Sequence, residues 1–508
     1  MMTMRAFKLA ILLCALVTAS VRAQTLAHKG WAGNGMTVEP WWQGAVFYQI
    51  DPVSFQDSKG DGFGDLEGII QRLDYLQSLG VDAVLLSPFQ LQPGFGRTSA
   101  GIPFDPKYGT EEDLDHLIQQ ASQHRIRILV DLPLSRTHSA QEMASVARFW
   151  LSRGIAGLRL TDEPSVANAA PELSSAQLAE RLRELERLTA PFAGQRVLFW
   201  DMAEPMPIAS RGQTRGGTAG EPQLLFSRQL AGLRSLVASE VIGALRAGGT
   251  GGTQTLVAAT DNGSRARSLD RLGGRLGDGT HEVALARLLA TALLAGRAAP
   301  LLYFGQEIGM ATTPAPTTPD NAGEPTPMQW GGETGFTSGV PWIDLGRNNA
   351  TANVALEDAD QDSLLNWYRR LSALRHSNAA LRSGSIDVLA PANPGVVAWL
   401  RRAHSPGTPA VLVVCNLSDR PAAVSLTGEL RRLGVEAGSS VLHTLATSST
   451  AATALAGPGA AETGMASTSN LTLPAYGIYL GEAGRAAGLE SAPAPVRRQP
   501  RHRRGRTA

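Results

Sequence analysis

Short apolar runs alternate with stretches of helical periodicity over most of this chain. The first two helical stretches, LEGIIQRLDYLQSLG and EEDLDHLIQQASQH, lead directly into the apolar runs VDAVLLS and RIRILVDL. Such alternation predicts βαβ units and a parallel sheet. Eight strands are predicted, the number that closes a (β/α)8 TIM barrel. They are 45–49, VDAVLLS, RIRILVDL, 157–160, 196–200, 223–226, 255–259 and 300–304.

The domain organisation follows from changes in this pattern. The barrel is expected to occupy residues 41–384 of the 508, a length that suits this fold. From residue 385 the runs VVAWLRR and AVLVVCNLS alternate with turn residues, which predicts a small antiparallel β-sandwich domain over 385–482. The remainder, 483–508, is rich in Ala, Pro and Arg and is expected to be a disordered tail.

The N-terminus has the features of an export signal. Two basic residues precede the apolar run LAILLCALVTA, and VRA offers a small-residue cleavage site. Residues 1–23 are therefore predicted to be a signal peptide and 24–40 a linker, which implies a periplasmic or secreted protein; a retained N-terminal anchor is the alternative. No later segment reaches the ~20 apolar residues that span a bilayer, so no membrane span is expected in the mature chain. Cleavage would leave Cys415 as the one cysteine, which excludes an internal disulfide.

The charge balance argues against a polyanionic partner. The formal net charge is +1 and 18% of the residues are charged, so no nucleic-acid binding is expected. The exception is the tail APVRRQPRHRRGRTA, whose arginines are expected to be solvated; a weak contact with an anionic surface is the alternative.

An Asp/Gly-rich loop, QDSKGDGFGD (56–65), follows the first predicted strand. Its aspartates, Asp57, Asp61 and Asp65, are separated by glycines that permit tight turns, a spacing that can bring carboxylates around Ca²⁺. Lys59 opposes this interpretation because it places a cation where a further ligand would help. Two interpretations stand, a Ca²⁺ site or an ordinary Asp/Gly turn. No organic cofactor is expected.

Charged residues follow several of the predicted strands. Asp131 ends the third strand, Arg159 and Asp162 lie at the end of the fourth, Asp201 ends the fifth and Asp261 follows the seventh. Because barrel strands share one C-terminal rim, three of the four carboxylates could face a common point. Glycoside chemistry uses two carboxylates, one that attacks or stabilises the sugar and one that protonates the leaving oxygen. Helix caps and rim salt bridges are the alternative.

Several ordered motifs carry a family resemblance. They are AVFYQIDPVSFQDSKGDGFGDLEGIIQRLDYLQSLGVDAVLLSP, FDPKYGTEEDLDHLI, RIRILVDL, RFWLSRGIAGLRL, APLLYFGQEIGM, TPMQW with VPW, and DSLLNWYRRLSALRHSNAALRSG. Together they resemble glycoside hydrolase family 13, the α-amylase and α-glucosidase family. The resemblance implies a (β/α)8 barrel and a retaining mechanism with an aspartate nucleophile, a glutamate acid/base and a transition-state-stabilising aspartate. It also implies oligo- or polysaccharides with α-glucosidic linkages as ligands.

Two catalytic positions depart from the family pattern. The fourth strand of the family ends Arg-x-Asp, with the Asp as nucleophile, whereas this chain has Thr161 two residues after Arg159 and its aspartate, Asp162, one residue late. Strand side chains alternate between faces, so Asp162 would point away from Arg159 unless a β-bulge restores it. The fifth strand should end in Glu and ends in Asp201, one methylene shorter, with Glu204 beyond it.

Positions expected to bind sugar also differ. The seventh strand ends Ala-Thr-Asp261 in place of Asn-His-Asp, which removes an imidazole. After the third strand, Asp131 is kept, but the following Asn-His is replaced and His138 comes two residues later. Asp131 and His138 are the predicted polar contacts to substrate. Aromatic residues can stack on a sugar ring, although packing in the core or rim is the alternative. The candidates are Trp200, Phe89 and Phe95.

A domain that the family usually inserts is missing. Fewer than thirty residues separate Asp131 from Arg159, enough for one loop and one helix. The usual insertion forms one wall of the sugar cleft. In lacking it, the chain resembles the heavy subunits of heteromeric amino-acid transporters, non-hydrolytic members of the superfamily. Those subunits have an anchoring helix that is not expected here, so their partner role does not carry over.

Two functions are consistent with this sequence. The first is an exported α-amylase-family barrel protein of carbohydrate metabolism that binds an α-glucosidic carbohydrate or a protein partner, with hydrolysis lost or severely impaired because several active-site groups are altered together. The second is an active retaining α-glucoside hydrolase or transglycosylase. It would use Asp162 as a shifted nucleophile, oriented by Arg159. Asp201 would then be the acid/base and Asp261 the stabiliser.

Overall fold

The structure is a computed structural model of the chain. It describes residues 39–87, 105–134, 139–161, 173–202, 222–248, 254–263, 265–273, 282–312, 325–332, 335–435, 441–448 and 465–483. Contacts divide the chain into two units, Met1–Pro40 and Trp41–Ala508. Several predicted features lie outside the described residues. They are the signal peptide, most of the linker, the tail, Phe89, Phe95, His138, Asp162 and Glu204.

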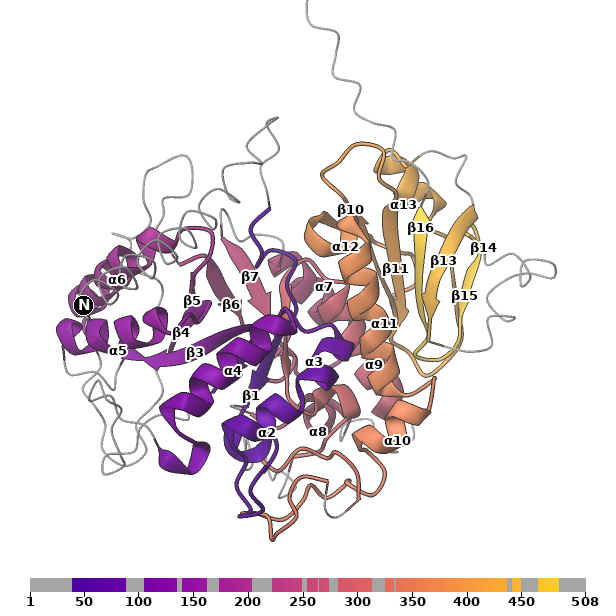
Figure 1. Cartoon of the computed structure of the whole chain (residues 1–508). Helices are drawn as coiled ribbons and strands as arrows, with labels where there is room; N and C mark the ends of the chain where they lie inside the picture. The colour runs from indigo at the N-terminus through magenta and orange to yellow at the C-terminus, as the bar shows by residue number, and fades with distance from the viewer. Residues whose placement is uncertain are drawn as a thin grey trace, which may run out of the picture. The chain divides into compact units, whose positions relative to one another are not determined.

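Eight parallel strands close into a barrel in chain order, and β8 pairs back to β1 (Figure 1). This confirms the predicted (β/α)8 fold, and each strand lies close to its predicted range. The strands are β1 (Phe47–Ile50), β2 (Ala83–Leu86), β3 (Arg127–Pro133), β4 (Gly157–Thr161), β5 (Val197–Asp201), β6 (Leu224–Ser227), β7 (Thr255–Ala258) and β8 (Ala299–Tyr303).

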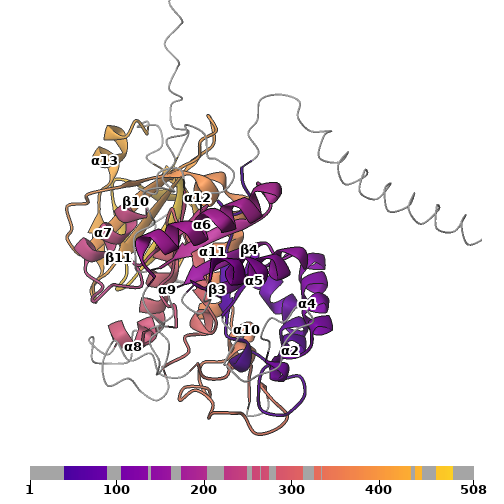
Figure 2. The same cartoon turned by 90° about the vertical axis from the view of Figure 1, so that its left-hand side faces the viewer.

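Helices surround the barrel (Figures 1 and 2), and polar caps fix where several begin. Thr110 and Ser174 form capping boxes that satisfy the first backbone amides of α4 and α6. Between β3 and β4 the structure describes the single helix α5, as the short connection predicted. The helices are α2 (Leu66–Gln71), α3 (Leu73–Leu79), α4 (Glu111–Gln123), α5 (Ala140–Ser152), α6 (Ser175–Thr189), α7 (Ala238–Ala247), α8 (Ser268–Gly273), α9 (Glu282–Leu294), α10 (Val354–Ala359), α11 (Leu364–Ser377) and α12 (Ala379–Ser383), with 3₁₀ turns η1 (Pro52–Ser54), η2 (Pro106–Tyr108), η4 (Ala190–Phe192) and η6 (Gln306–Ile308).

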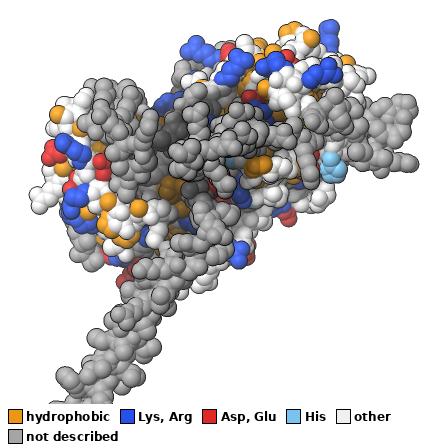
Figure 3. Space-filling model, turned by 90° about the horizontal axis from the view of Figure 1, so that it is seen from above, with side chains coloured by type: hydrophobic (Ala, Val, Ile, Leu, Met, Phe, Trp, Pro, Cys, Tyr) orange, Lys and Arg blue, Asp and Glu red, His pale blue; other side chains and the backbone are white. Residues whose placement is uncertain are grey.

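The described surface is mixed in character. In Figure 3, Lys and Arg side chains lie scattered among apolar and acidic ones. No helix in the described ranges is long and apolar enough to cross a membrane. The large apolar side chains exposed on the described part are Val237, Val283, Val340 and Leu356.

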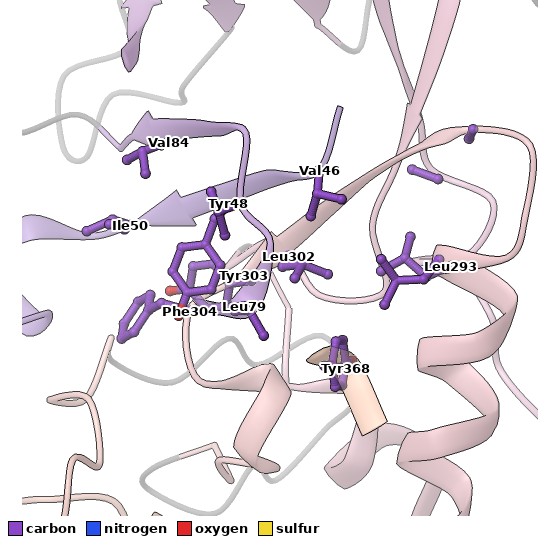
Figure 4. Close-up of a cluster of buried hydrophobic side chains, with 14 of the residues drawn as sticks. Val46, Tyr48, Ile50, Leu79, Val84, Leu293, Leu302, Tyr303, Phe304 and Tyr368 are labelled. Carbon is purple, nitrogen blue, oxygen red and sulfur yellow. The ribbon is translucent and has the colours of Figure 1, made fainter. Parts of the chain in front are cut away.

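Strand residues alternate between the barrel interior and the helix-facing side. Phe47, Leu129 and Phe199 belong to the interior cluster. Their neighbours point outward, as Figure 4 shows for Tyr48, which packs near Leu302 of β8 among side chains from the surrounding helices. The buried apolar faces hold the barrel closed, and they leave the C-terminal strand ends to carry polar groups.

The C-terminal domain has two antiparallel sheets, as predicted. Six strands pair in the order β14-β13-β16-β11-β10-β9, and β12 pairs with β15. Both sheets contribute to one apolar cluster that includes Leu412, Val424 and Leu473. The elements are β9 (Ser385–Val388), β10 (Val396–Arg402), β11 (Ala410–Asn416), β12 (Ala422–Val424), α13 (Thr427–Arg432), β13 (Val441–Thr447), β14 (Met465–Ser467), β15 (Leu471–Leu473) and β16 (Ile478–Ala483).

A buried arginine, Arg401 of β10, joins this domain to the barrel. Its guanidinium donates to the carbonyl oxygen of Ala295, just beyond α9, at 2.9 Å and to that of Gly384 at 3.0 Å, and it also bonds the carbonyls of Gly296 and Ser385. Burial lowers the pKa of Arg401, and the neighbouring arginine cations lower it further. The carbonyls at a helix C-terminus carry partial negative charge, so they offset part of the cost of burying this cation.

Candidate functional site

Polar side chains gather at the C-terminal ends of β1, β3, β4 and β5. In the parallel register Asp131 pairs with Arg159, and Thr161 pairs with Asp201. Residues two apart share a face, so Arg159 and Thr161 lie on the same side of β4. Gln49 of β1 completes the group, because its side chain accepts a hydrogen bond from Arg159. These five residues are called the barrel-mouth cluster below.

Arg159 is the centre of the barrel-mouth cluster. Its Nε and Nη2 donate to the two carboxylate oxygens of Asp131, both at 2.6 Å. Its Nη1 donates to Gln49 Oε1 at 3.1 Å and lies 3.5 Å from Asp201 Oδ2. Arg159 and Asp131 are both buried. A buried bidentate pair of this kind is strong and fixes the guanidinium in place.

Asp201 lies between two guanidinium groups. Arg228, just beyond β6, donates from Nη2 to Asp201 Oδ1 at 3.0 Å, while Arg159 faces Oδ2. The Asp201 side chain is 12% exposed and that of Arg228 is 50% exposed. Asp201 therefore reaches the surface of the barrel mouth, and both of its oxygens face a cation.

Thr161 occupies the position where the family pattern has its nucleophilic aspartate. The residue is only 8% exposed. Its hydroxyl has no hydrogen-bond partner among the described residues. The pairing of β4 with β3 and β5 runs without a register shift from Gly157 to Thr161, so the β-bulge that would realign Asp162 is not present within β4. Asp162 itself lies outside the described residues.

The described contacts of Asp261 are with residues outside the barrel-mouth cluster. Its carboxylate accepts hydrogen bonds from the backbone amide and the hydroxyl of Ser268, where α8 begins. It lines a small cavity with Gln306 and Tyr368, a residue of the outer helix α11. Burial raises the pKa of Asp261, and the charge of Arg267 offsets part of that rise. Its described contacts therefore correspond to the helix-cap alternative and not to convergence with Asp131 and Asp201.

Trp200 also differs from its predicted role. It belongs to the apolar cluster on the helix-facing side of β5, with Leu158 and Leu160, and is 5% exposed. Strand alternation explains this placement, because its neighbours Phe199 and Asp201 take the interior face. The packing alternative therefore describes Trp200 better than stacking on a sugar.

Protein donors surround the carboxylate of Asp57 in the Asp/Gly loop. Asp57 Oδ1 accepts from the amides of Lys59 and Gly60, both at 2.8 Å, and Oδ2 accepts from Gly62 at 2.7 Å and Thr337 Oγ1 at 2.5 Å. Asp65 caps α2 and lies 3.8 Å from the Lys59 ammonium. Among the described residues no group of three or more His, Cys, Asp or Glu side chains could hold a metal.

The remaining aspartate of the loop leads to the same conclusion. The exposed residue Asp61 accepts from the Phe63 amide at 3.0 Å, as in an Asx turn. The loop as a whole fits the Asp/Gly-turn interpretation, in which protein donors satisfy the carboxylates.

We expect removal of divalent cations to leave the melting temperature unchanged, whereas Asp57→Asn destabilises the fold by about 2 kcal/mol, because an amide cannot accept four donors. Burial raises the pKa of Asp57, but hydrogen bonds from Thr337 and from the backbone amides outweigh this, so the pKa is lowered from 3.8. At pH values above 3.8 the ionised carboxylate of Asp57 therefore stabilises the fold. This contribution is lost as the pH falls through the lower pKa that the carboxyl group has in the folded protein.

Thermal unfolding of both proteins with and without EDTA, from neutral pH downward, checks this. The difference between wild type and variant should shrink in acid. A drop in melting temperature of several degrees with EDTA would restore the Ca²⁺ interpretation.

Two members of this site had little signal in the sequence. Arg228 follows the weakly predicted sixth strand, and only the closed barrel brings it to Asp201. Gln49 lies inside an apolar run, where alternation alone marks it as facing the interior with Phe47.

Fold and site together define a TIM-barrel protein whose charged groups gather at the C-terminal strand ends, as in glycoside-acting barrels. The sequence model of the family "Alpha amylase, catalytic domain" matches residues 49–142 and 254–384. The family model and the relatives support membership of glycoside hydrolase family 13, the α-amylase family, in agreement with the resemblance. The match is interrupted between 142 and 254, the segment that contains β4, β5 and β6.

Individual relatives agree with this membership. The chain is 27% identical to the trehalose-6-phosphate hydrolase of Escherichia coli K12 in an alignment 515 positions long, which covers 74% of this chain and 91% of the relative. It is 26% identical to a probable α-glucosidase of Rhizobium meliloti, with 76% and 91% covered. The solved trehalulose synthase MutB of Pseudomonas mesoacidophila MX-45 shares the fold, with a TM-score of 0.68, 22% identity, and 88% and 100% of the two chains covered.

Proposed function

We propose that the protein is an exported α-amylase-family barrel protein that binds α-glucosidic carbohydrate at the barrel mouth, with hydrolysis lost or severely impaired. The observation that carries this proposal is Thr161. A buried hydroxyl without a described partner stands where a retaining family member has its nucleophile. A threonine hydroxyl cannot replace a carboxylate that must attack the sugar and leave again.

Asp201 adds to the argument against efficient hydrolysis. A retaining site needs an acid about 5 to 5.5 Å from the nucleophile, protonated when the leaving oxygen departs. Oδ1 of Asp201 accepts a hydrogen bond from Arg228, and Oδ2 faces the Arg159 guanidinium, so both oxygens are already directed at cationic donors and not at a leaving group. Its side chain is also one methylene shorter than the family's glutamate.

Carbohydrate remains the best-supported ligand for two reasons. The barrel-mouth cluster offers Thr161 and Asp201, whose side chains can exchange hydrogen bonds with sugar hydroxyls. The relatives include enzymes named for α-glucosidic substrates, such as the oligo-1,6-glucosidase of Bacillus cereus. Export rests on the signal-like N-terminus, and N-terminal sequencing of the mature protein from the periplasm and the medium tests it.

We expect the purified mature chain to bind at least one α-glucoside by calorimetry and to show little or no turnover. The panel is starch, maltose, isomaltose, trehalose, sucrose and a nitrophenyl α-glucoside, each tested with and without Ca²⁺, because Thr161 cannot act as nucleophile.

An Asp201→Asn variant controls the hydrolysis assay. Turnover by the wild type that this variant loses would contradict the proposal and favour an enzyme that uses Asp162. Folded protein that binds none of the sugars would point instead to a protein partner.

A further inference from the structure

Arg228 stands apart from the other charged groups at the barrel mouth. Its guanidinium donates to Asp201 Oδ1 at 3.0 Å and lies 5.4 Å from the ring centroid of Phe226. Half of its side chain is exposed, whereas Asp201 is 12% exposed. Arg228 thus covers the carboxylate oxygen from the solvent side, and the Phe226 ring helps to hold it there.

The two arginines that face Asp201 differ in how readily they move. Arg159 is buried and bound to Asp131 by two hydrogen bonds of 2.6 Å, so displacing it would leave a buried carboxylate without its partner. Arg228 makes one hydrogen bond to Asp201 from a half-exposed position, and exposed ion pairs are weak. A ligand that reaches Asp201 therefore displaces Arg228.

Sugar hydroxyls bind a carboxylate by donating hydrogen bonds to its oxygens. At Asp201 Oδ1 a sugar hydroxyl would compete with Arg228, which already donates a hydrogen bond to this oxygen. We propose that Arg228 is a specificity-determining residue of the barrel mouth: it competes with the hydroxyl groups of neutral sugars for Asp201 and so sets how tightly they bind. This inference rests on the proposed carbohydrate-binding function and names the residue that limits it.

Replacing Arg228 with Gln removes the competing charge and keeps a side chain of similar length. Loss of a weak, exposed ion pair corresponds to a change in affinity of about two- to fivefold, so the variant should bind neutral α-glucosides with a Kd lower by about that factor. Arg228→Lys, which keeps the positive charge, should stay close to the wild type. Isothermal titration with the sugars of the panel measures all three proteins.

Arg148 provides a matched control. Its side chain is 52% exposed and makes one ion pair, 3.3 Å long, with Glu184, between α5 and α6. Arg148→Gln should leave sugar affinity unchanged. Equal affinities of Arg228→Gln and the wild type would overturn this inference alone, because binding by both would still support the proposed function. Absence of binding by every form would overturn both.

Ionic strength tests the same competition without a substitution. Raising NaCl from about 0.05 M to about 0.5 M shortens the screening length and weakens an exposed ion pair. The affinity of the wild type should then rise towards that of Arg228→Gln, whose affinity should change little. If the difference in sugar affinity between the wild type and Arg228→Gln does not change with salt, Arg228 does not compete through its charge.

Discussion

The combined substitution Thr161→Asp and Asp201→Glu is expected to create measurable hydrolysis of α-glucosides. Thr161 and Asp201 are paired in the β4–β5 register, and Arg159 lies on the same face of β4, so the two new side chains would restore a nucleophile and an acid on neighbouring strands. Because misplacing a reacting group by ~1 Å costs about a hundredfold, we expect the variant to exceed the wild-type background by at least about that factor. Release of nitrophenol from a nitrophenyl α-glucoside measures it.

The matched control is Thr161→Asn with Asp201→Glu, which has nearly the same shape but no nucleophile, and it should remain at background. If the variant with Thr161→Asp and Asp201→Glu folds and hydrolyses no sugar of the panel, Thr161 is not the main reason that the wild type lacks hydrolysis. The altered seventh strand, where Asp261 caps α8, would then be the next position to change.

Arg401→Met is expected to cause the largest loss of stability among single substitutions at the domain junction. The methionine fills part of the space, but the carbonyls of Ala295, Gly296, Gly384 and Ser385 lose a charged donor in a buried place. Trp399 still donates to Ala295 and Arg375 to Gly296, so Gly384 and Ser385 lose the most. Each unsatisfied buried carbonyl costs about 1 to 3 kcal/mol, so we expect the free energy of unfolding to fall by about 2 to 5 kcal/mol. Chemical denaturation measures this change.

Arg431→Met in α13 is the comparison, because its side chain is exposed and the change should stay within about 0.5 kcal/mol. If Arg401→Met were as mild as Arg431→Met, the remaining donors Trp399 and Arg375 would suffice at the end of α9, and the junction would depend on apolar contacts such as those of Trp399.

The fold was predictable because each strand of a TIM barrel is a short apolar run followed by an amphipathic helix. RIRILVDL and its neighbouring helices carried that signal clearly, and the observed β3 is close to its predicted range. The β-sandwich domain was predictable for a related reason. From residue 385 the alternation of strands with helical stretches gives way to strand patterns separated by turn residues. Even the weak sixth strand formed, because closure of the barrel requires it.

The candidate site was only partly predictable. Asp131 and Arg159 were expected at the rim, and they meet there because strand ends in a barrel adjoin. The direction of Asp261 depends on how the chain turns after β7, and no local pattern fixes it. Trp200 was misplaced because a single tryptophan beside a candidate acid suggests stacking, whereas alternation with Asp201 already assigned it to the opposite face.

The donors of Arg401 have a consequence for how the chain can be divided. The carbonyls at the end of α9 accept hydrogen bonds from Arg401 and Trp399 of β10, and also from Arg375 of the barrel helix α11. A polypeptide that stops at Gly384 would retain every barrel strand and Arg375, and yet lose the donors that β10 supplies to Ala295 and Gly296. Residue 384 therefore marks a change of sequence pattern, while hydrogen bonds from β10 to the end of α9 cross that boundary.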